Sequence, residues 1–433
     1  MSAGFSQRHR KWLGWLNVLA RFASVQLVIQ VIGFLSGILI VRHLSKSDYG
    51  WFTITGSIIG TLSALADSGV SGGVAAVGGA IWQDRAKFSS LIRTALALRA
   101  KLAVVSAIVA TPVFIWMLLR SDAPSPVIAV LVPVVLLNLV LQFTANVFGV
   151  GFWFRQDLRK LQWFSLAPAL IRSALIAVAC LLVLDARIAV IIGTLATAFQ
   201  LFFVRRWERD NMDFNAPVSP EYHAQILSIV RKQAPLTIFF CLQGQISIWL
   251  ITIFGNAQRV AELGALGRFA MIFAFFISVM NGIVVPRFAR CQDRHLLRRR
   301  YWQVAFGYML AAGSLVALSA AFPRLLLWVI GTQYANLEGE VWLMMLTGAL
   351  GGLATILGYL IYSKGWILPA KITIPMEIGI QTVLILSFDL STVRGVLLVG
   401  CIGQVPMILV SVIIAQMRMG KVASTPDPLP GAR

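Results

Sequence analysis

Long apolar stretches alternate with short polar segments along the whole chain. The first stretch, Phe22 to Val41, contains no charged residue. Since an α-helix rises 1.5 Å per residue, about 20 apolar residues cross the roughly 30 Å of bilayer hydrocarbon. We therefore predict an all-α integral membrane protein with twelve transmembrane helices. The predicted spans begin near Phe22, Trp51, Leu102, Val127, Phe164, Ile188, Pro235, Leu263, Val304, Val341, Pro369 and Val396.

Composition and charge agree with a membrane protein and orient it. Hydrophobic residues make up 58% of the chain and charged residues 12%, outside the range of soluble domains. The net charge of +20 comes mainly from Lys and Arg in the alternate loops that include both termini, whereas the acids are divided almost evenly between the two sides. Because cytoplasmic loops are enriched in Lys and Arg, we expect both termini in the cytoplasm. The charge indicates topology and does not indicate nucleic-acid binding.

The chain divides into two similar halves around a polar break, Arg205 to Lys232. Gln83-Asp84-Arg85 after the second span recurs as Gln292-Asp293-Arg294 after the eighth. We predict an N-lobe at residues 1–204, with a basic surface helix from Phe5 to Ala20 and spans one to six. A cytoplasmic linker at 205–232 and a C-lobe at 233–433 follow. Because six spans per half is even, a pseudo-twofold axis along the membrane normal is expected, with the transport site between the lobes.

The polar segment between the first two spans has the pattern of a helix start. Ser45 followed by Asp48 is a capping box, in which the serine accepts from an early backbone N–H and the acid bonds back. Leu44 and Tyr49 occupy the positions of a hydrophobic staple. The second span is therefore predicted to begin at about Lys46.

Three motifs around this start occur in order: Arg42-His43-Leu44-Ser45, Asp48-Tyr49-Gly50 and Asp67-Ser68-Gly69-Val70. Together with Pro323, Gly331 and Tyr334 before the tenth span, they resemble the lipid-linked oligosaccharide flippases. These form the polysaccharide-transporter (O-antigen flippase-like) branch of the multidrug/oligosaccharidyl-lipid/polysaccharide exporter superfamily. The second-half counterpart of Asp48-Tyr49-Gly50, Glu262-Leu263-Gly264, departs from the pattern because it lacks the capping serine.

The resemblance implies an alternating-access flippase of the bacterial inner membrane, coupled to an ion gradient. Its implied substrate is an undecaprenyl-pyrophosphate-linked oligosaccharide for lipopolysaccharide O-antigen or exopolysaccharide synthesis. Membrane lipids, a polysaccharide polymerase and chain-length machinery are implied partners. Three alternatives stay open: a drug/cation antiporter of the related multidrug branch, a membrane polysaccharide polymerase or glycosyltransferase, and a non-transporting scaffold.

Several sequence features argue against an enzyme. The outer loops are short, and the sequence contains no P-loop. The four histidines, His9, His43, His223 and His295, lack metal-ligand spacing. We therefore expect no catalytic residue, metal or cofactor.

Basic residues in or beside spans are the candidates for binding a pyrophosphate. A charge inside hydrocarbon costs at least about 2.5–3.5 kcal/mol, so it needs a partner or an aqueous cavity. Arg172 in span five and Arg268 in span eight are predicted to line a cationic cavity, because guanidinium binds phosphate oxygens bidentately. The alternative is a structural ion pair or a snorkelling side chain. Arg21 and Arg42 bracket span one, as interface anchors or as the rim of the cavity.

Two acids and several amides complete the candidate residues. Glu377 in span eleven and Asp67 near the inner end of span two are candidates for ion coupling. The alternatives for Glu377 are that a basic neighbour neutralises it or that it stays protonated throughout. The alternative for Asp67 is that it satisfies backbone N–H groups where a Gly-rich stretch bends the helix. Gln26, Gln30 and Gln243 are candidate sugar contacts, and the alternative for such amides is interhelical hydrogen bonding.

Overall fold

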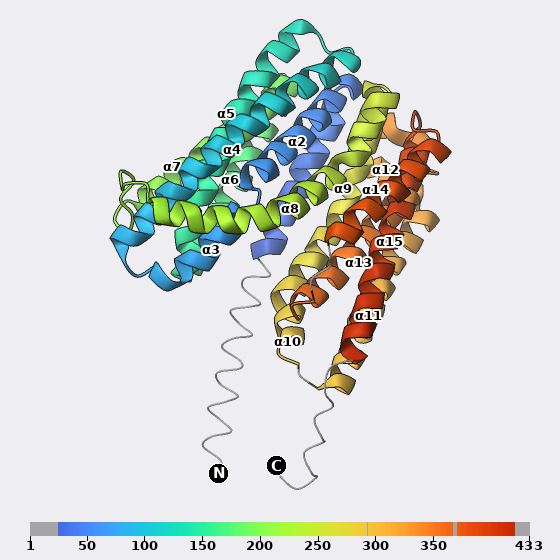
Figure 1. The fold of residues 1–433 in the computed structure, drawn as a ribbon. Coiled ribbons are helices and arrows are strands. Elements are labelled where there is room, and N and C mark those ends of the chain that lie inside the picture. Colours follow the sequence, from blue (N-terminus) through green and yellow to red (C-terminus); the bar gives the residue numbers. More distant parts are fainter. Residues whose placement is uncertain (1–24, 292, 367–369, 421–433) are drawn as a thin grey trace, which may run out of the picture. The chain divides into compact units, whose positions relative to one another are not determined.

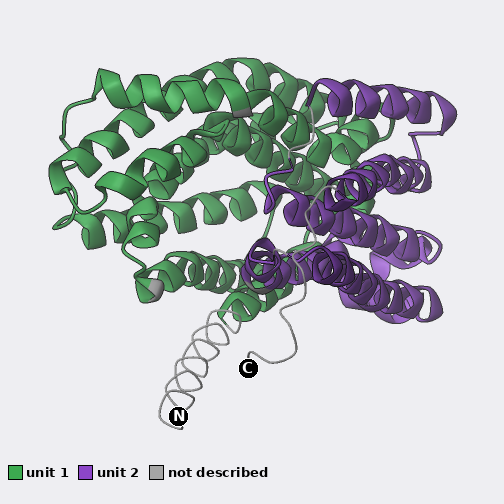
Figure 2. Cartoon of the chain, turned by 60° about the horizontal axis from the view of Figure 1, so that its bottom comes forward, with its two compact units in different colours: residues 1–264 green, residues 265–433 purple. Residues whose placement is uncertain are grey.

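The described part of the protein is helical. The computed structural model describes residues 25–291, 293–366 and 370–420, and it contains no β-strand within those ranges. Packing divides the chain into two compact units, unit 1 at Met1–Gly264 and unit 2 at Ala265–Arg433 (Figure 2). The predicted surface helix from Phe5 to Ala20 lies outside the described residues.

Unit 1 begins with the helix Val25–His43 and ends in the first turns of α9 (Figure 1). Within this unit α5 packs extensively on α7, α2 on α4, and α8 on α2, α3 and α4. Between the first helix and α9 the elements are α2 (Lys46–Asp67), α3 (Val70–Ile81), α4 (Arg85–Arg120), α5 (Ser125–Phe154), α6 (Leu158–Leu181), α7 (Ala186–Glu208) and α8 (Pro220–Phe254).

Unit 2 contains the remaining turns of α9 (Ala257–Val279) and the elements that follow it. Its centre is α13, which packs on α11 and α15, while α14 packs on α15. The elements are the π-helical segment η1 (Met280–Val284), α10 (Val285–Ala289), α11 (Arg294–Ala321), α12 (Pro323–Ile330), the 3-10 segment η2 (Thr332–Leu337), α13 (Val341–Tyr362), α14 (Ala370–Ser387) and α15 (Val393–Gly420).

The helices have the lengths that the apolar stretches predict. Among the described residues, 11 helices are long and apolar enough to cross a membrane, and the bent pair α2 and α3 brings the number to as many as 12. Polar ends extend several of them beyond the hydrocarbon; α4 has 36 residues and α8 has 35. The chain is therefore a multi-pass membrane protein, as predicted.

The start of α2 confirms the predicted cap and changes one of its details. Ser45 Oγ accepts from the backbone N–H of Asp48 at 3.1 Å, and the helix begins at Lys46. The Ser45 hydroxyl also donates to the Asp48 carboxylate at 2.6 Å, instead of that carboxylate bonding back to the backbone. Leu44 and Tyr49 are both buried, as the staple requires. The segment is a helix start that needs no ligand.

The two matching motifs of the sequence, Asp48-Tyr49-Gly50 and Glu262-Leu263-Gly264, meet in space. Gly50 lies so close to the first turn of α9 that a Cβ atom would stand 2.3 Å from the carbonyl oxygen of Ala257. At Gly264 a Cβ atom would stand 2.5 Å from Oγ1 of Thr53, and the Tyr49 hydroxyl donates to the Gly264 carbonyl at 3.3 Å. The glycines are thus needed for helix contact between α2 and the start of α9.

Much of the predicted linker is ordered against α4. Its irregular part is limited to residues 209–219, because α7 continues to Glu208 and α8 begins at Pro220. Two backbone N–H groups of this segment, those of Asp213 and Ser219, each donate at 2.9 Å to hydroxyls of α4. Contacts place α8 in unit 1. The lobes predicted at 1–204 and 233–433 are the halves expected to move during transport. That division stays a prediction.

The contact at Gly50 gives the first test. We expect Gly50→Ala to lower the free energy of unfolding by about 1–3 kcal/mol, because the added methyl group meets backbone that has to move. Gly56→Ala in the same helix is the matched control: a Cβ atom there meets nothing within 4 Å. The control is expected to be neutral or to gain up to about 1 kcal/mol from helix propensity. Thermal unfolding in detergent measures both; equal melting temperatures would contradict the contact.

Candidate functional site

The second span is broken where the Gly-rich stretch follows Asp67. Ser68 and Gly69 adopt left-handed backbone conformations, with φ of 38° and 93°. The axes of α2 and α3 differ by 44°. A break inside an apolar span exposes backbone N–H groups that water does not reach, so side chains have to satisfy them. The break therefore places polar backbone groups, and the side chains that bind them, within the membrane-spanning part of unit 1.

Asp67 provides the acceptor at this break, and Arg99 of α4 neutralises it. The Asp67 carboxylate accepts from the backbone N–H of Ser71 at 3.1 Å and from its hydroxyl at 2.8 Å. The Arg99 guanidinium forms an ion pair with the same carboxylate and donates to the Ser71 hydroxyl at 2.6 Å. The Arg99 side chain is 6% exposed and that of Asp67 29%. Asp67 thus has the backbone role considered from sequence, together with an arginine partner that no local pattern indicates.

Two other acids of unit 1 are buried against bases at helix ends. Glu208 at the end of α7 is fully buried and pairs with Arg155, the residue that follows α5. Glu262 in the first turns of α9 is 4% exposed and contacts Lys46 at 3.4 Å and Arg259 at 2.9 Å. The pairs Arg155–Glu208 and Lys46–Glu262 join segments that are distant in sequence, whereas Arg259 and Glu262 lie one turn apart on α9. Since a buried acid that is ionised needs compensation, these pairs hold the helix ends in place.

The predicted cationic residues are distributed between the two units. Arg172 lies in α6 and is half-buried, within unit 1. Arg268 lies in α9 and is half-buried, within unit 2. Arg42, near the end of the first helix, is exposed. Arg21 lies outside the described residues. The structure describes each unit by itself, so a common cavity for Arg172 and Arg268 stays a prediction.

The predicted amides have different surroundings. Gln26 and Gln30 in the first helix and Gln243 in α8 are half-buried. Their neighbour Gln245, two residues after Gln243, reaches α2: a Cβ atom at Gly60 would stand 3.4 Å from its Nε2. Sugar contact by the first three amides stays a prediction.

Asn138 in α5 illustrates the structural alternative for polar residues in spans. Its amide donates to Oγ1 of Thr194 at 3.3 Å and of Thr197 at 3.4 Å, both on α7. This hydrogen bonding between helices is the ordinary use of an amide inside a membrane protein.

Glu377 is a buried acid of unit 2, and its environment differs from that of the buried acids in unit 1. It lies in α14 and is 3% exposed. Neither of its carboxylate oxygens has a hydrogen-bond partner among the described residues. Thr373 and Gln381, one turn before and one turn after it, are also buried, so the three form a polar stripe along one face of the helix. Among the described residues no basic side chain forms an ion pair with Glu377, so the predicted alternative of a neutralising basic neighbour is not seen there.

The pair at the helix break gives the second test. We expect Asp67→Asn to lower the free energy of unfolding by about 2–4 kcal/mol, because it leaves the buried Arg99 guanidinium without its counter-charge. Arg99→Met is expected to cost less, since the remaining Asp67 carboxylate is partly exposed. Combining both changes should recover part of the loss. Thermal unfolding of the three variants in detergent measures the order, and an Arg99→Met protein less stable than Asp67→Asn would contradict the account.

Comparison with known proteins identifies the fold. No protein-family model matches the sequence, and no curated protein is significantly similar to it. Solved structures do match along nearly the full length. The lipid II flippase MurJ in an inward closed conformation matches with a TM-score of 0.71 and 10% identity, over 92% of this chain and 87% of that chain.

Multidrug transporters share the fold as well. An inward-facing multidrug resistance MATE family transporter of the MOP superfamily matches with a TM-score of 0.65 and 13% identity, over 93% of this chain and 100% of that one. A MOP superfamily transporter from Pyrococcus furiosus, whose binding pocket is described as having reversed polarity, matches with a TM-score of 0.62 and 13% identity, over 94% and 96%. These proteins are transporters and a flippase, not enzymes. The chain thus has the all-helical fold that MATE transporters share with MurJ.

Proposed function

We propose that the protein is a flippase that moves an undecaprenyl-pyrophosphate-linked oligosaccharide across the bacterial inner membrane for surface polysaccharide synthesis. The observation that carries this proposal is the likeness of fold to the lipid II flippase MurJ over 92% of the chain. The ordered motifs around Arg42, Asp48 and Asp67, which resemble the oligosaccharide flippases, support it independently.

The charges of unit 1 suit an anionic substrate. Glu208 and Glu262 are buried and Asp67 is half-buried, and each of them contacts an arginine or a lysine. Their negative charge is therefore already compensated within the protein. A pyrophosphate that enters near Arg172 and Arg268 would meet cationic side chains, and these lower the cost of bringing a multiply charged group into a region of low dielectric constant.

Transport follows from alternating access of the two predicted lobes, residues 1–204 and 233–433. The charged head crosses between the lobes while the lipid tail stays in the bilayer. Both termini lie in the cytoplasm, where most Lys and Arg are located. A polymerase and chain-length machinery on the outer side use the flipped glycan.

Glu377 is the residue that couples this cycle to a proton gradient. A carboxyl group buried without a partner is more stable neutral than ionised, because an ionised group there loses its hydration without compensation. Exchange of its proton then requires a conformation in which water reaches α14. Binding and release of a proton on different sides of the membrane would bias the two states of the transporter.

A drug/cation antiporter is the second candidate, and Glu377 is the observation that favours it. A buried carboxylate is the group that attracts an organic cation, and multidrug MATE transporters share the fold. The two functions differ in what Arg172 and Arg268 do. They help to bind a pyrophosphate, whereas they repel a cation.

The cationic residues give the third test. In proteoliposomes with lipid-linked oligosaccharide in one leaflet, we expect Arg172→Gln and Arg268→Gln each to slow flipping roughly tenfold or more, because a charge-assisted hydrogen bond contributes about 1.5–3 kcal/mol. Arg120→Gln and Arg394→Gln, at exposed arginines of α4 and α15, are the matched controls. Flipping by both cavity variants at the control rate would refute the pyrophosphate site, and faster cation export would favour the antiporter.

The buried acid gives the fourth test. We expect Glu377→Gln to fold and to flip at a rate that no longer responds to an imposed pH gradient, because glutamine has the same shape but carries no exchangeable charge. Glu338→Gln is the control in the same unit, since Glu338 is exposed and pairs with Arg324 at 2.9 Å. The measurement is the flipping rate with and without the gradient. A Glu377→Gln protein that still responds like the control would remove Glu377 from coupling.

A further inference from the structure

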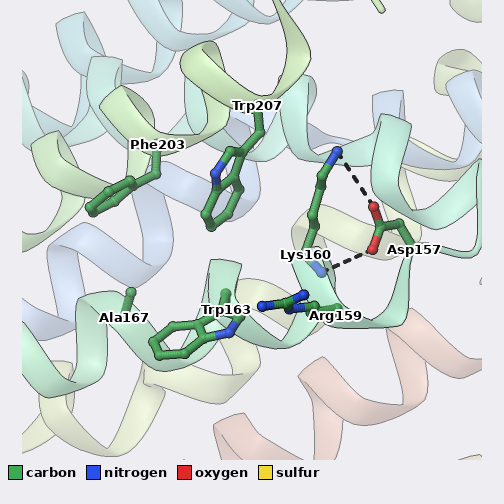
Figure 3. A pocket seen from close by; sticks show the side chains of 7 residues that line it. All are labelled: Asp157, Arg159, Lys160, Trp163, Ala167, Phe203 and Trp207. Carbon is green, nitrogen blue, oxygen red and sulfur yellow. Dashed lines mark hydrogen bonds and ion pairs between the residues drawn. The ribbon is translucent and has the colours of Figure 1, made fainter.

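A cavity of about 570 Å³ opens between α6 and α7 in unit 1. Its polar end is formed by Asp157, Arg159 and Lys160, and its apolar end by aromatic side chains and Ala167 (Figure 3). Neither Arg172 nor any other predicted site residue lines it. The cavity therefore shares no residue with the candidate transport site.

The polar end carries a net positive charge. Asp157 caps α6 by accepting from the backbone N–H of Lys160 at 3.1 Å, and its second oxygen lies 3.5 Å from Nζ of Lys160. The acid is therefore occupied by the helix cap and by one lysine. Arg159 is exposed and pairs with no acid among the described residues. An anion at this end would meet the Arg159 guanidinium and the remaining hydrogens of the Lys160 ammonium.

The apolar end is built as a fixed aromatic slot. Trp207 stacks on Phe203 with ring centroids 5.7 Å apart. Phe152 packs edge-on against Trp207, with ring centroids 6.0 Å apart. Trp163 lies on the opposite wall and is 46% exposed (Figure 3). Trp163 and Ala167 are one turn apart on α6, as are Phe203 and Trp207 on α7, so the slot follows the direction of the two helices.

The place of the cavity along the helices determines what kind of molecule fits. Asp157 to Lys160 stand at the start of α6 and Trp207 stands near the end of α7, and both helices are long enough to span a membrane. The charged end therefore lies at a membrane–water interface, where Trp and basic side chains meet lipid headgroups. The slot leads from there toward the hydrocarbon, where Ala167 and Phe203 lie.

We propose that this cavity binds a membrane lipid whose phosphate headgroup carries a net negative charge. The phosphate is held by Arg159 and Lys160, and the first part of the lipid chain lies along Trp163, Ala167 and Phe203. The exposed Arg205, Arg206 and Arg209 at the same end of α7 raise the local concentration of anionic lipid. This site does not depend on the proposed substrate, because the cavity belongs to α6 and α7 alone.

Lipid binding to the purified full-length protein tests the site. Native mass spectrometry with phosphatidylglycerol, polyprenyl phosphate or zwitterionic phosphatidylcholine gives the affinity for each lipid. We expect the two lipids with a net negative phosphate group to bind more tightly than phosphatidylcholine. Arg159→Gln and Lys160→Gln should each weaken their binding roughly fivefold, the usual effect of one basic residue near an anionic headgroup.

The chain contains a closely matched control. Asp84 caps α4 by accepting from the Lys87 N–H at 3.1 Å and lies 3.5 Å from Lys87 Nζ, as Asp157 does with Lys160. Lys87 does not line the cavity, so Lys87→Gln should leave lipid affinity unchanged. Trp163→Ala tests the apolar end and should weaken binding of both phosphatidylglycerol and polyprenyl phosphate. Unchanged melting temperatures show that each variant folds.

Three outcomes would overturn the proposal. Phosphatidylcholine that binds as tightly as phosphatidylglycerol would mean that the net negative charge of the headgroup is not recognised. Arg159→Gln and Lys160→Gln proteins that bind lipid like Lys87→Gln would place the lipid elsewhere. Inorganic phosphate that displaces the lipid at equal concentration would mean that the slot contributes nothing and that the site takes a free anion. Lipid loss confined to the cavity variants supports the site.

Discussion

Compensation of charge inside the membrane is the constraint on which the rest of this structure depends. Hydrophobic residues make up 58% of the chain, and their burial in the bilayer stabilises the membrane-spanning helices. Each ionised group inside such a helix has to pair with an opposite charge or reach water. In unit 1 the acids Asp67, Glu208 and Glu262 meet this requirement through bases on other helices or on the same turn. These pairs stand at helix ends and at the break between α2 and α3, where backbone groups also need partners. The same few positions therefore pair the buried charges and provide hydrogen-bond partners for the backbone.

The local features of the fold are the ones that the sequence predicts well. Apolar stretches fix the spans, because only a helix satisfies its own backbone in lipid. Ser45 fixes the start of α2, and the Gly-rich stretch after Asp67 fixes its end, since both signals act within four residues. The partner of Asp67 is different. Arg99 lies 32 positions away in α4, and many other basic residues were equally compatible with the sequence, so only the packing of α2 on α4 selects it.

The matching motifs at Gly50 and Gly264 also show that a sequence pattern does not tell which distant segments are in contact. Sequence comparison indicates that the two segments are copies, but it does not indicate that they touch. The structure adds a physical reason for the two glycines: a small residue at each position permits the close approach of α2 and α9.

The α6/α7 cavity is likewise formed by residues whose separate patterns are common. Asp157 with Lys160 has the pattern of a helix cap, and the tryptophans have that of residues at a membrane interface. Their combination depends on how α6 packs on α7, and no local pattern contains that information.

The paired acids of unit 1 and Glu377 differ in how their charge is compensated. Protonating an acid that is paired with a base leaves that base without its counter-charge, so such a group is a poor carrier of protons. Glu377 has no such partner among the described residues, and gaining or losing its proton changes the charge of its surroundings without stranding a base. A carrier of protons has to be stable in both forms at different stages of a cycle, which requires water to reach it in one of them. This difference is the reason that we propose Glu377, and not a paired acid of unit 1, as the group that couples protonation to a change of conformation.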